Sequence, residues 1–139
     1  MIILDTNIIS EFMRDLPDAA VVHWLDDQPR SSVWTTSINV YEIHSGLLAM
    51  PSGKRQSLRL LAFEHFLNDT IQGRIAAFDH VAAQRAAELQ AAGQKSGRPR
   101  DPRDTMIAGI VLASRATLVT RNTKHFEDIA KSVINPWET

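Results

Sequence analysis

The sequence predicts an α/β fold in which helices cover both faces of a central, mainly parallel β-sheet. Three observations support this prediction. Short apolar or β-branched runs alternate along the chain with segments of helical spacing. The first run, residues 1–4 (MIIL), is apolar throughout, as in a strand that is buried on both faces of a parallel sheet. With 139 residues, the chain has the length of one domain, so we expect a single domain over 1–139.

The first half of the chain is predicted to contain two strands separated and followed by helices. The opening strand ends at Asp5, and a helix begins near Thr6. Asp18, which follows a proline, is a suitable N-cap for an amphipathic helix. β-branched and aromatic residues over 32–36 (SVWTT) favour a strand. A helix is then expected to begin near Ser37 and to run through Glu42 and Leu48 to a break around 51–53 (PSG). A further helix over 54–71 is indicated by the apolar spacing of Leu58, Leu61, Phe66 and Ile71.

The second half repeats this alternation. Residues 74–78 (RIAAF) form a weak strand signal, and Asp79 can cap a helix that continues through Ala92. Residues 93–99 (GQKSGRP) have the composition of a flexible basic loop. A cap, a proline and an acidic third position over 101–104 (DPRD) open a helix from Thr105 to about Arg115. Strands are expected at 117–120 and 132–134, with a short helix over 124–129 between them.

Composition excludes several classes of protein and site. The chain has 15 basic and 16 acidic residues and a net charge of -1, so a nucleic acid would have to bind a local patch rather than a global basic field. It has no cysteine, which excludes disulfides, thiolate zinc sites, iron–sulfur clusters and cysteine nucleophiles. The histidines lack ligand spacing, and the glycine-rich nucleotide loops and the serine-hydrolase elbow are absent. Because no apolar run is long enough for a signal peptide or a spanning helix, we expect a cytoplasmic protein without a membrane partner.

Polar side chains follow the predicted strands at the edge where parallel α/β sheets place their ligands. Asp5 follows the first strand, and Glu42 lies early in the helix after the second. Asp104 lies in the first turn of the helix that leads to the 117–120 strand, and Asn122 comes just after that strand. If the three acids converge, their charges repel one another or bind a cation. An all-oxygen set selects Mg²⁺ or Mn²⁺, whose chemistry in such sites is phosphoryl or phosphodiester transfer.

Each of these residues also has a purely structural interpretation. Asp5 and Asn122 can cap the helices that follow them, and Glu42 can complete a capping box with Asn39. Against that, the neighbours of Glu42 one and two turns away form a stripe of small residues suited to packing on the sheet: Ile38, Ser45, Gly46 and Ala49. Asp101 is expected to cap the helix that begins at 101–104, whereas Asp104 is expected to face the cleft.

Basic residues border the proposed acidic site from two segments. They are Lys95, Arg98, Arg100 and Arg103 before Asp104, with Arg121 and Lys124 beside Asn122. Such a rim could hold a nucleic-acid backbone on either side of the cleaved phosphate. A solvated loop explains the same residues equally well.

Several stretches together resemble the PIN-domain ribonucleases, and specifically the VapC-type toxins of bacterial toxin–antitoxin pairs, in their FitB-like branch. The resemblance lies in MIILDTNIISEFMR at the start, the helix around Tyr41 and Glu42, residues 98–113 (RPRDPRDTMIAGIVLA), residues 118–128 (LVTRNTKHFED) and INPW at 134–137. It spans nearly the whole chain and keeps the order of the motifs.

The resemblance implies a PIN-like three-layer sandwich and an Mg²⁺- or Mn²⁺-dependent endoribonuclease toxin. Its substrate would be RNA, often tRNA, and an antitoxin encoded beside it would neutralise it. Asp5, Glu42 and Asp104 match the acids taken as metal ligands, and Thr120 matches the hydroxyl that ends the later strand. Asn122 stands where many PIN domains have a fourth acid, which favours one firmly held ion over two. Thr120 and Asn122 would support water or metal.

The same resemblance implies a homodimer and a larger toxin–antitoxin assembly that contacts operator DNA through the antitoxin. Two other functions stay open at this point. One is a catalytically idle PIN-like module that only binds a partner protein. The other is an Mg²⁺-dependent phosphatase with Asp5 as nucleophile, although the LDTN stretch lacks a second aspartate two residues later.

Overall fold

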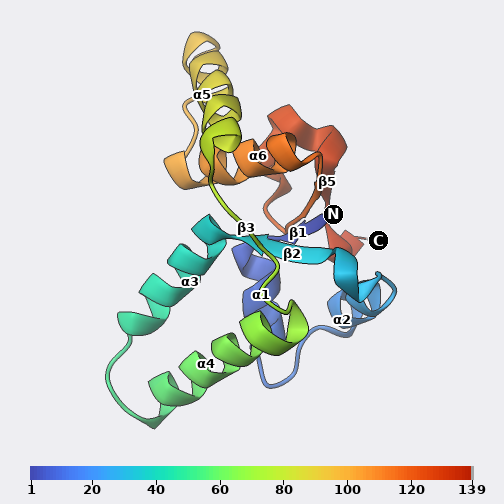
Figure 1. The fold of residues 1–139 in the computed structure, drawn as a ribbon, viewed down its shortest axis with the longest axis vertical. Coiled ribbons are helices and arrows are strands. Elements are labelled where there is room, and N and C mark those ends of the chain that lie inside the picture. Colours follow the sequence, from blue (N-terminus) through green and yellow to red (C-terminus); the bar gives the residue numbers. More distant parts are fainter. Residues whose placement is uncertain (139) are drawn as a thin grey trace.

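The computed structural model describes residues 1–138; Thr139, the last residue of the predicted domain, lies outside the described residues. A five-stranded sheet in the order β3-β2-β1-β4-β5 separates two layers of helices (Figure 1). All its neighbouring strands pair in parallel, which confirms the predicted α/β class. The strands are β1 (Ile2–Leu4), β2 (Val33–Thr36), β3 (Ile75–Ala76), β4 (Thr117–Val119) and β5 (Val133–Ile134).

The helices alternate with these strands much as the sequence predicts. The α-helices are α1 (Thr6–Phe12), α2 (Ala19–Asp26), α3 (Ser37–Leu48), α4 (Lys54–His65), α5 (His80–Lys95) and α6 (Pro102–Ser114). Three further segments are 3₁₀-helical, and one is a π-helix. The 3₁₀ segments are η1 (Arg30–Ser32), η3 (Thr123–Ser132) and η4 (Pro136–Glu138), and the π-helix is η2 (Phe66–Thr70). No helix within residues 1–138 combines the length and the apolar character needed to cross a bilayer.

Three predicted boundaries are corrected. The helix expected from Thr105 begins at Pro102, because proline suits the first helical position after the Asp101 cap. The helix expected to stop at Ala92 continues to Lys95, so the predicted basic loop is shorter. The short helix expected over 124–129 is a run of 3₁₀ turns, with non-helical backbone at Phe126 and Ile129.

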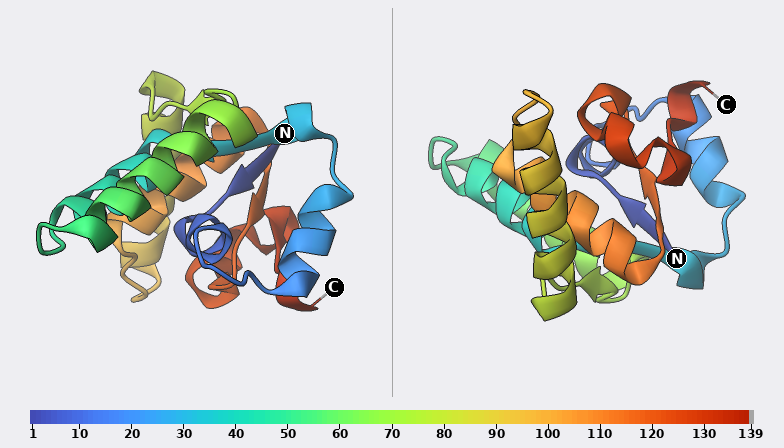
Figure 2. Two further views of the ribbon diagram at one scale, coloured as in Figure 1. Left: turned by 90° about the horizontal axis from the view of Figure 1, so that it is seen from below. Right: turned by 90° about the horizontal axis from the view of Figure 1, so that it is seen from above.

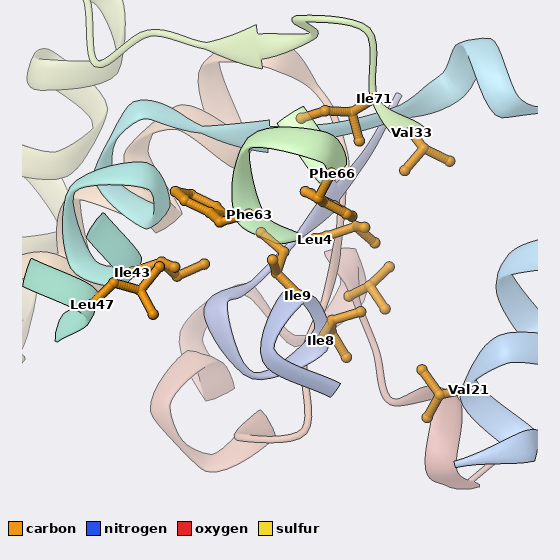
Figure 3. Packing of buried hydrophobic residues seen from close by; sticks show 11 residues of the cluster. Leu4, Ile8, Ile9, Val21, Val33, Ile43, Leu47, Phe63, Phe66 and Ile71 are labelled. Carbon is orange, nitrogen blue, oxygen red and sulfur yellow. The ribbon is translucent and has the colours of Figure 1, made fainter. Parts of the chain in front are cut away.

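The sheet has a hydrophobic cluster on each face, and β1 contributes to both. Leu4 packs with α1, α3 and α4 in the first cluster, where Ile8, Phe63 and Ile71 are buried (Figure 3). Ile3 points the other way and packs with α6 and η3 in the second cluster. Figure 2 shows α5 and α6 on one side of the sheet and α1, α3 and α4 on the other. The prediction that the first strand is buried on both faces is therefore confirmed.

One predicted packing surface is wrong and a second is wrong in part. Ser45 and Gly46 of α3 and the following Ala49 are exposed, and the buried positions of this helix are instead Asn39, Ile43 and Leu47. Of the apolar residues predicted to share a face over 54–71, Leu58 and Leu61 are exposed, whereas Phe66 and Ile71 are buried. Both errors have the same cause, because helical spacing identifies a face but not which of two faces meets the sheet.

Candidate active site

Asp5 lies at the carboxyl end of β1 and is 6% exposed. It is the N-cap of α1, and its Oδ1 accepts hydrogen bonds from the Thr6 backbone N–H (2.8 Å) and from Asn39 Nδ2 (2.9 Å). Its Oδ2 accepts from Thr120 Oγ1 (2.7 Å) and, at 3.4 Å, from Asn7 Nδ2. Asp5 therefore caps α1 as predicted. Its carboxylate also accepts hydrogen bonds from α3 and from the residue after β4, so it is held from three elements.

Asn39 connects α3 to Asp5. Thr36 is the N-cap of α3 and accepts from the Asn39 backbone N–H, while its hydroxyl donates to Asn39 Oδ1 (2.6 Å). This contact turns the amide Nδ2 toward Asp5 Oδ1 and Thr6 Oγ1. The capping box expected between Asn39 and Glu42 is wrong, because Thr36 takes the cap and Asn39 lies inside the helix.

Thr120 closes the site from the carboxyl end of β4. Its buried hydroxyl donates to Asp5 and accepts from Asn7 Nδ2 (3.2 Å) and from the backbone N–H of Asn122 (3.0 Å). The Asn7 side chain in turn accepts from the Arg121 backbone N–H (3.0 Å). The Asn122 side chain is exposed and does not cap η3, so only its backbone joins this network.

Glu42 lies one turn beyond Asn39 on α3 and is half-buried. Burial raises the pKa of its carboxyl, and the charge of Asp5 raises this pKa further. Arg103 lowers the pKa, and Asp104 and Asp101 raise it by smaller amounts. The charges of Asp5 and Asp104 therefore both raise the pKa of Glu42.

Asp101 is the N-cap of α6, as the sequence predicts, and Asp104 lies in the first turn of this helix. The Asp101 carboxylate caps α6 by accepting from the backbone N–H groups of Arg103 (2.9 Å) and Asp104 (3.3 Å). The largely buried Asp104 side chain lies 3.2 Å from His125 Nδ1. Burial raises the pKa of Asp104, His125 lowers it, and Asp101 and Asp5 raise it further.

The donor set of Asp5, Glu42 and Asp104 fits a hard divalent cation chemically, since all its atoms are carboxylate oxygens. Besides burial, the charge of Asp5 raises the pKa values of both Glu42 and Asp104, a repulsion that a cation between them would relieve. Within residues 1–138, however, no three acidic or histidine side chains are close enough to form a metal centre as they stand. A bound cation would have to draw Glu42 and Asp104 toward Asp5.

Sequence reasoning did not identify two residues of this edge. The sequence indicates Asn39 only as a possible cap, although its position one turn before Glu42 places both residues on the same helical face. His125 belongs to a set of scattered histidines without ligand spacing, and only the path of η3 brings it to Asp104.

Comparison with known proteins gives matches over nearly the whole chain. The profile of the PIN domain matches residues 2–132. Plasmid stability protein StbB of Pseudomonas syringae pv. tomato is 39% identical over 138 residues, and VapC ribonuclease Y4jK of Sinorhizobium fredii is 38% identical over 138 residues. Toxin FitB of Neisseria gonorrhoeae is 32% identical over 137 residues, and all three alignments cover 99% of both chains.

Solved structures give the same result. A chain in the structure of FitAB bound to an IR36 DNA fragment superposes with a TM-score of 0.88 at 32% identity. The match covers 99% of this chain and 96% of that one. The described fold is thus that of a known family along its full length.

Proposed function

Because this chain belongs to the PIN-domain family, we propose that it is the metal-dependent endoribonuclease toxin of a toxin–antitoxin pair. Relatives named as a VapC ribonuclease and as toxin FitB match it over nearly their whole length. The observation that carries the proposal is the electrostatic coupling of Asp5, Glu42 and Asp104 at one edge of the sheet. Three acids at one partly buried edge, where burial and the charge of Asp5 raise the pKa values of the other two, are typical of a cation-binding catalytic centre.

The residues have distinct roles in this proposal. Asp5, Glu42 and Asp104 would hold Mg²⁺ or Mn²⁺, which when bound supplies a water of lowered pKa and neutralises charge on the attacked phosphate. Asn39 and Thr120 hold the Asp5 carboxylate in one orientation, because Asn39 donates to Oδ1 and Thr120 donates to Oδ2. Asn122 leaves the site with three formal acidic charges, which suits one firmly held ion.

The phosphatase alternative is disfavoured by the residue two positions after Asp5. This residue is Asn7, whose amide nitrogen donates to Thr120 Oγ1 (3.2 Å) and whose Oδ1 accepts from the Arg121 backbone N–H (3.0 Å). An amide cannot supply the general acid that a second aspartate would supply to the leaving group. The idle binding module differs from the ribonuclease only in lacking turnover, so the experiment below separates these two.

Partners follow from the related complexes. A chain similar to this one occurs in the FitAB complex on a DNA fragment, so we assign this chain a cognate antitoxin that carries the assembly to operator DNA. A basic antitoxin side chain that pairs with Asp5, Glu42 or Asp104 would occupy the place of the cation and inhibit cleavage. We also assign the chain an RNA substrate, a homodimeric state and action in the cytoplasm.

The test is RNA cleavage by the purified protein. Wild type should cleave RNA with Mg²⁺ or Mn²⁺, and the co-purified antitoxin should suppress this cleavage. Asp104→Asn should lose it while keeping antitoxin binding. A second assay expresses wild type and Asp104→Asn in cells without the antitoxin and measures growth. If Asp104→Asn arrests growth as wild type does, the idle binding module is the better description.

A further inference from the structure

A cavity of about 710 Å³ adjoins the acidic edge on the side of α5 and α6. It lies between the C-terminal end of α5, the segment that leads to α6, and η3, and Asp104 is part of its wall. Its volume is within the range of about 300–1,000 Å³ that is usual for small-molecule sites. A ligand seated there would be directly beside the proposed cleavage site.

Arg100 is the buried cation of this cavity. Its side chain is 9% exposed, its Nε donates to Thr105 Oγ1 (3.1 Å), and its Nη1 is paired with Asp128. Its Nη2 is buried and has no hydrogen-bond partner among residues 1–138. A buried N–H without an acceptor is unfavourable. Arg100 lines the cavity, so a local rearrangement of its wall that lets a ligand oxygen reach Nη2 would complete the set of partners of Arg100.

The wall also contains two exposed cations and four carboxylates. The cations are Arg98, on the segment between α5 and α6, and Lys124, on η3. Asp104 is in contact with His125. Asp128 is paired with Arg100, and the Asp101 carboxylate is occupied by the cap of α6. Glu127 on η3 has no such partner in the described residues. A bare phosphate would use the cations but not the Glu127 carboxylate, whereas a nucleotide also has sugar hydroxyl or base amino groups to donate to it.

We propose that this cavity, lined by Arg98, Arg100, Lys124 and Glu127, is a binding subsite for one nucleotide of the RNA next to the cleaved bond. Arg98 and Lys124 contact its phosphate, Arg100 supplies the buried guanidinium, and Glu127 accepts from its sugar or base. The inference rests on the proposed ribonuclease function, because it takes the ligand to be part of the substrate strand. It adds a binding site that lies outside the acidic centre.

The test uses a 12-nucleotide single-stranded RNA of mixed sequence, in EDTA so that it is not cleaved. In ¹⁵N spectra of the protein, the amides of Gly93, Ser96 and Glu127 should shift saturably as this RNA is added. The double variant Arg98→Gln/Lys124→Gln removes two exposed charges. It should bind more weakly, and the slope of log Kd against log salt should fall by about 0.7, the contribution of the one single-strand phosphate that Arg98 and Lys124 contact together.

The matched control is Lys54→Gln/Arg55→Gln, which removes two exposed charges at the start of α4, on the other side of the sheet (Figure 1). This variant should keep the wild-type Kd and slope. Equal weakening by both double variants, or no saturable shift of the cavity amides in wild type, would overturn the inference. Inorganic phosphate that shifts the same amides with the same affinity as the RNA would also overturn it, because the site would then recognise only an anion.

Cleavage of RNA by wild type with Mn²⁺ is measured separately. If wild type cleaves but the Arg98/Lys124 variant keeps its affinity and salt slope, the subsite is refuted and the ribonuclease function stands. If wild type binds the RNA through the cavity but does not cleave any RNA, the proposed function fails instead.

Discussion

Two acids in one turn of α6, Asp101 and Asp104, should respond in opposite ways to substitution. The Asp101 side chain accepts from two backbone N–H groups at the start of the helix and has no other described partner. Asp101→Ala leaves these donors to water and should cost about 1 kcal/mol, the usual value of an N-cap. Because its carboxylate is engaged by the cap of α6, RNA cleavage should be largely retained.

Asp104→Asn should behave in the reverse manner. Burial and the charges of Asp101 and Asp5 raise the pKa of Asp104, so the ionised carboxylate is disfavoured in the metal-free fold. The amide removes that penalty but also loses the ionic contact with His125, 3.2 Å away. We expect the metal-free free energy of unfolding to stay within about 0.5 kcal/mol of wild type or to rise. Cleavage should fall by several orders of magnitude, because a metal ligand is lost.

Denaturant unfolding in EDTA and RNA cleavage with Mn²⁺, measured on both variants, give the two quantities needed. The reasoning is refuted if Asp101→Ala abolishes cleavage at unchanged stability while Asp104→Asn only destabilises the fold. The roles of cap and ligand would then be exchanged.

Three further predictions concern metal, pH and packing. Mg²⁺ or Mn²⁺ at about 100 times its Kd should stabilise wild type by about 2.7 kcal/mol. Thermal melts should show that Asp5→Asn loses this increment. An equal metal response of both proteins would mean that Asp5 is only a cap. The raised pKa values of Glu42 and Asp104 stabilise the metal-free fold at pH values below the ordinary carboxyl range, and this stabilisation is lost as pH rises through the raised pKa values. The free energy of unfolding should therefore fall less steeply from acid toward neutral pH in Glu42→Gln/Asp104→Asn than in wild type. Parallel pH curves would contradict the coupling. A Cβ at Gly109 would lie 2.5 Å from the Ala82 carbonyl oxygen, so Gly109→Ala should cost about 1–3 kcal/mol in urea unfolding, whereas Gly46→Ala, with open space around it, should not destabilise.

Much of the fold is predictable from local sequence. The positions of the five strands and the capping residues Asp18, Asp79 and Asp101 follow from patterns within a few residues, and the alternation of strands with helices predicts the parallel sheet. The spatial order of the strands does not, because it depends on which distant segments pair. The exposure of Ser45 and Gly46 could not be read from the sequence for a similar reason, since the packing of α4 decides which side of α3 is covered.

The candidate site divides in the same way. Asp5, Glu42 and Asp104 are recognisable because each follows or opens an element at the carboxyl edge of the sheet. The partners of Asp5 are less visible, because Asn39 and Thr120 lie 34 and 115 residues from it along the chain. Short polar side chains that meet only through the tertiary fold have no spacing that marks them in advance.

The most direct test of the acidic edge as a catalytic centre is the rate of RNA cleavage by purified wild type and Glu42→Gln, each with Mn²⁺ and with EDTA. Glu42 is half-buried and makes no described hydrogen bond, so its amide variant should fold normally, as circular dichroism can verify. Cleavage should occur only for wild type with Mn²⁺. Equal cleavage by wild type in EDTA, or by folded Glu42→Gln with Mn²⁺, would contradict a metal-dependent site at this edge of the sheet.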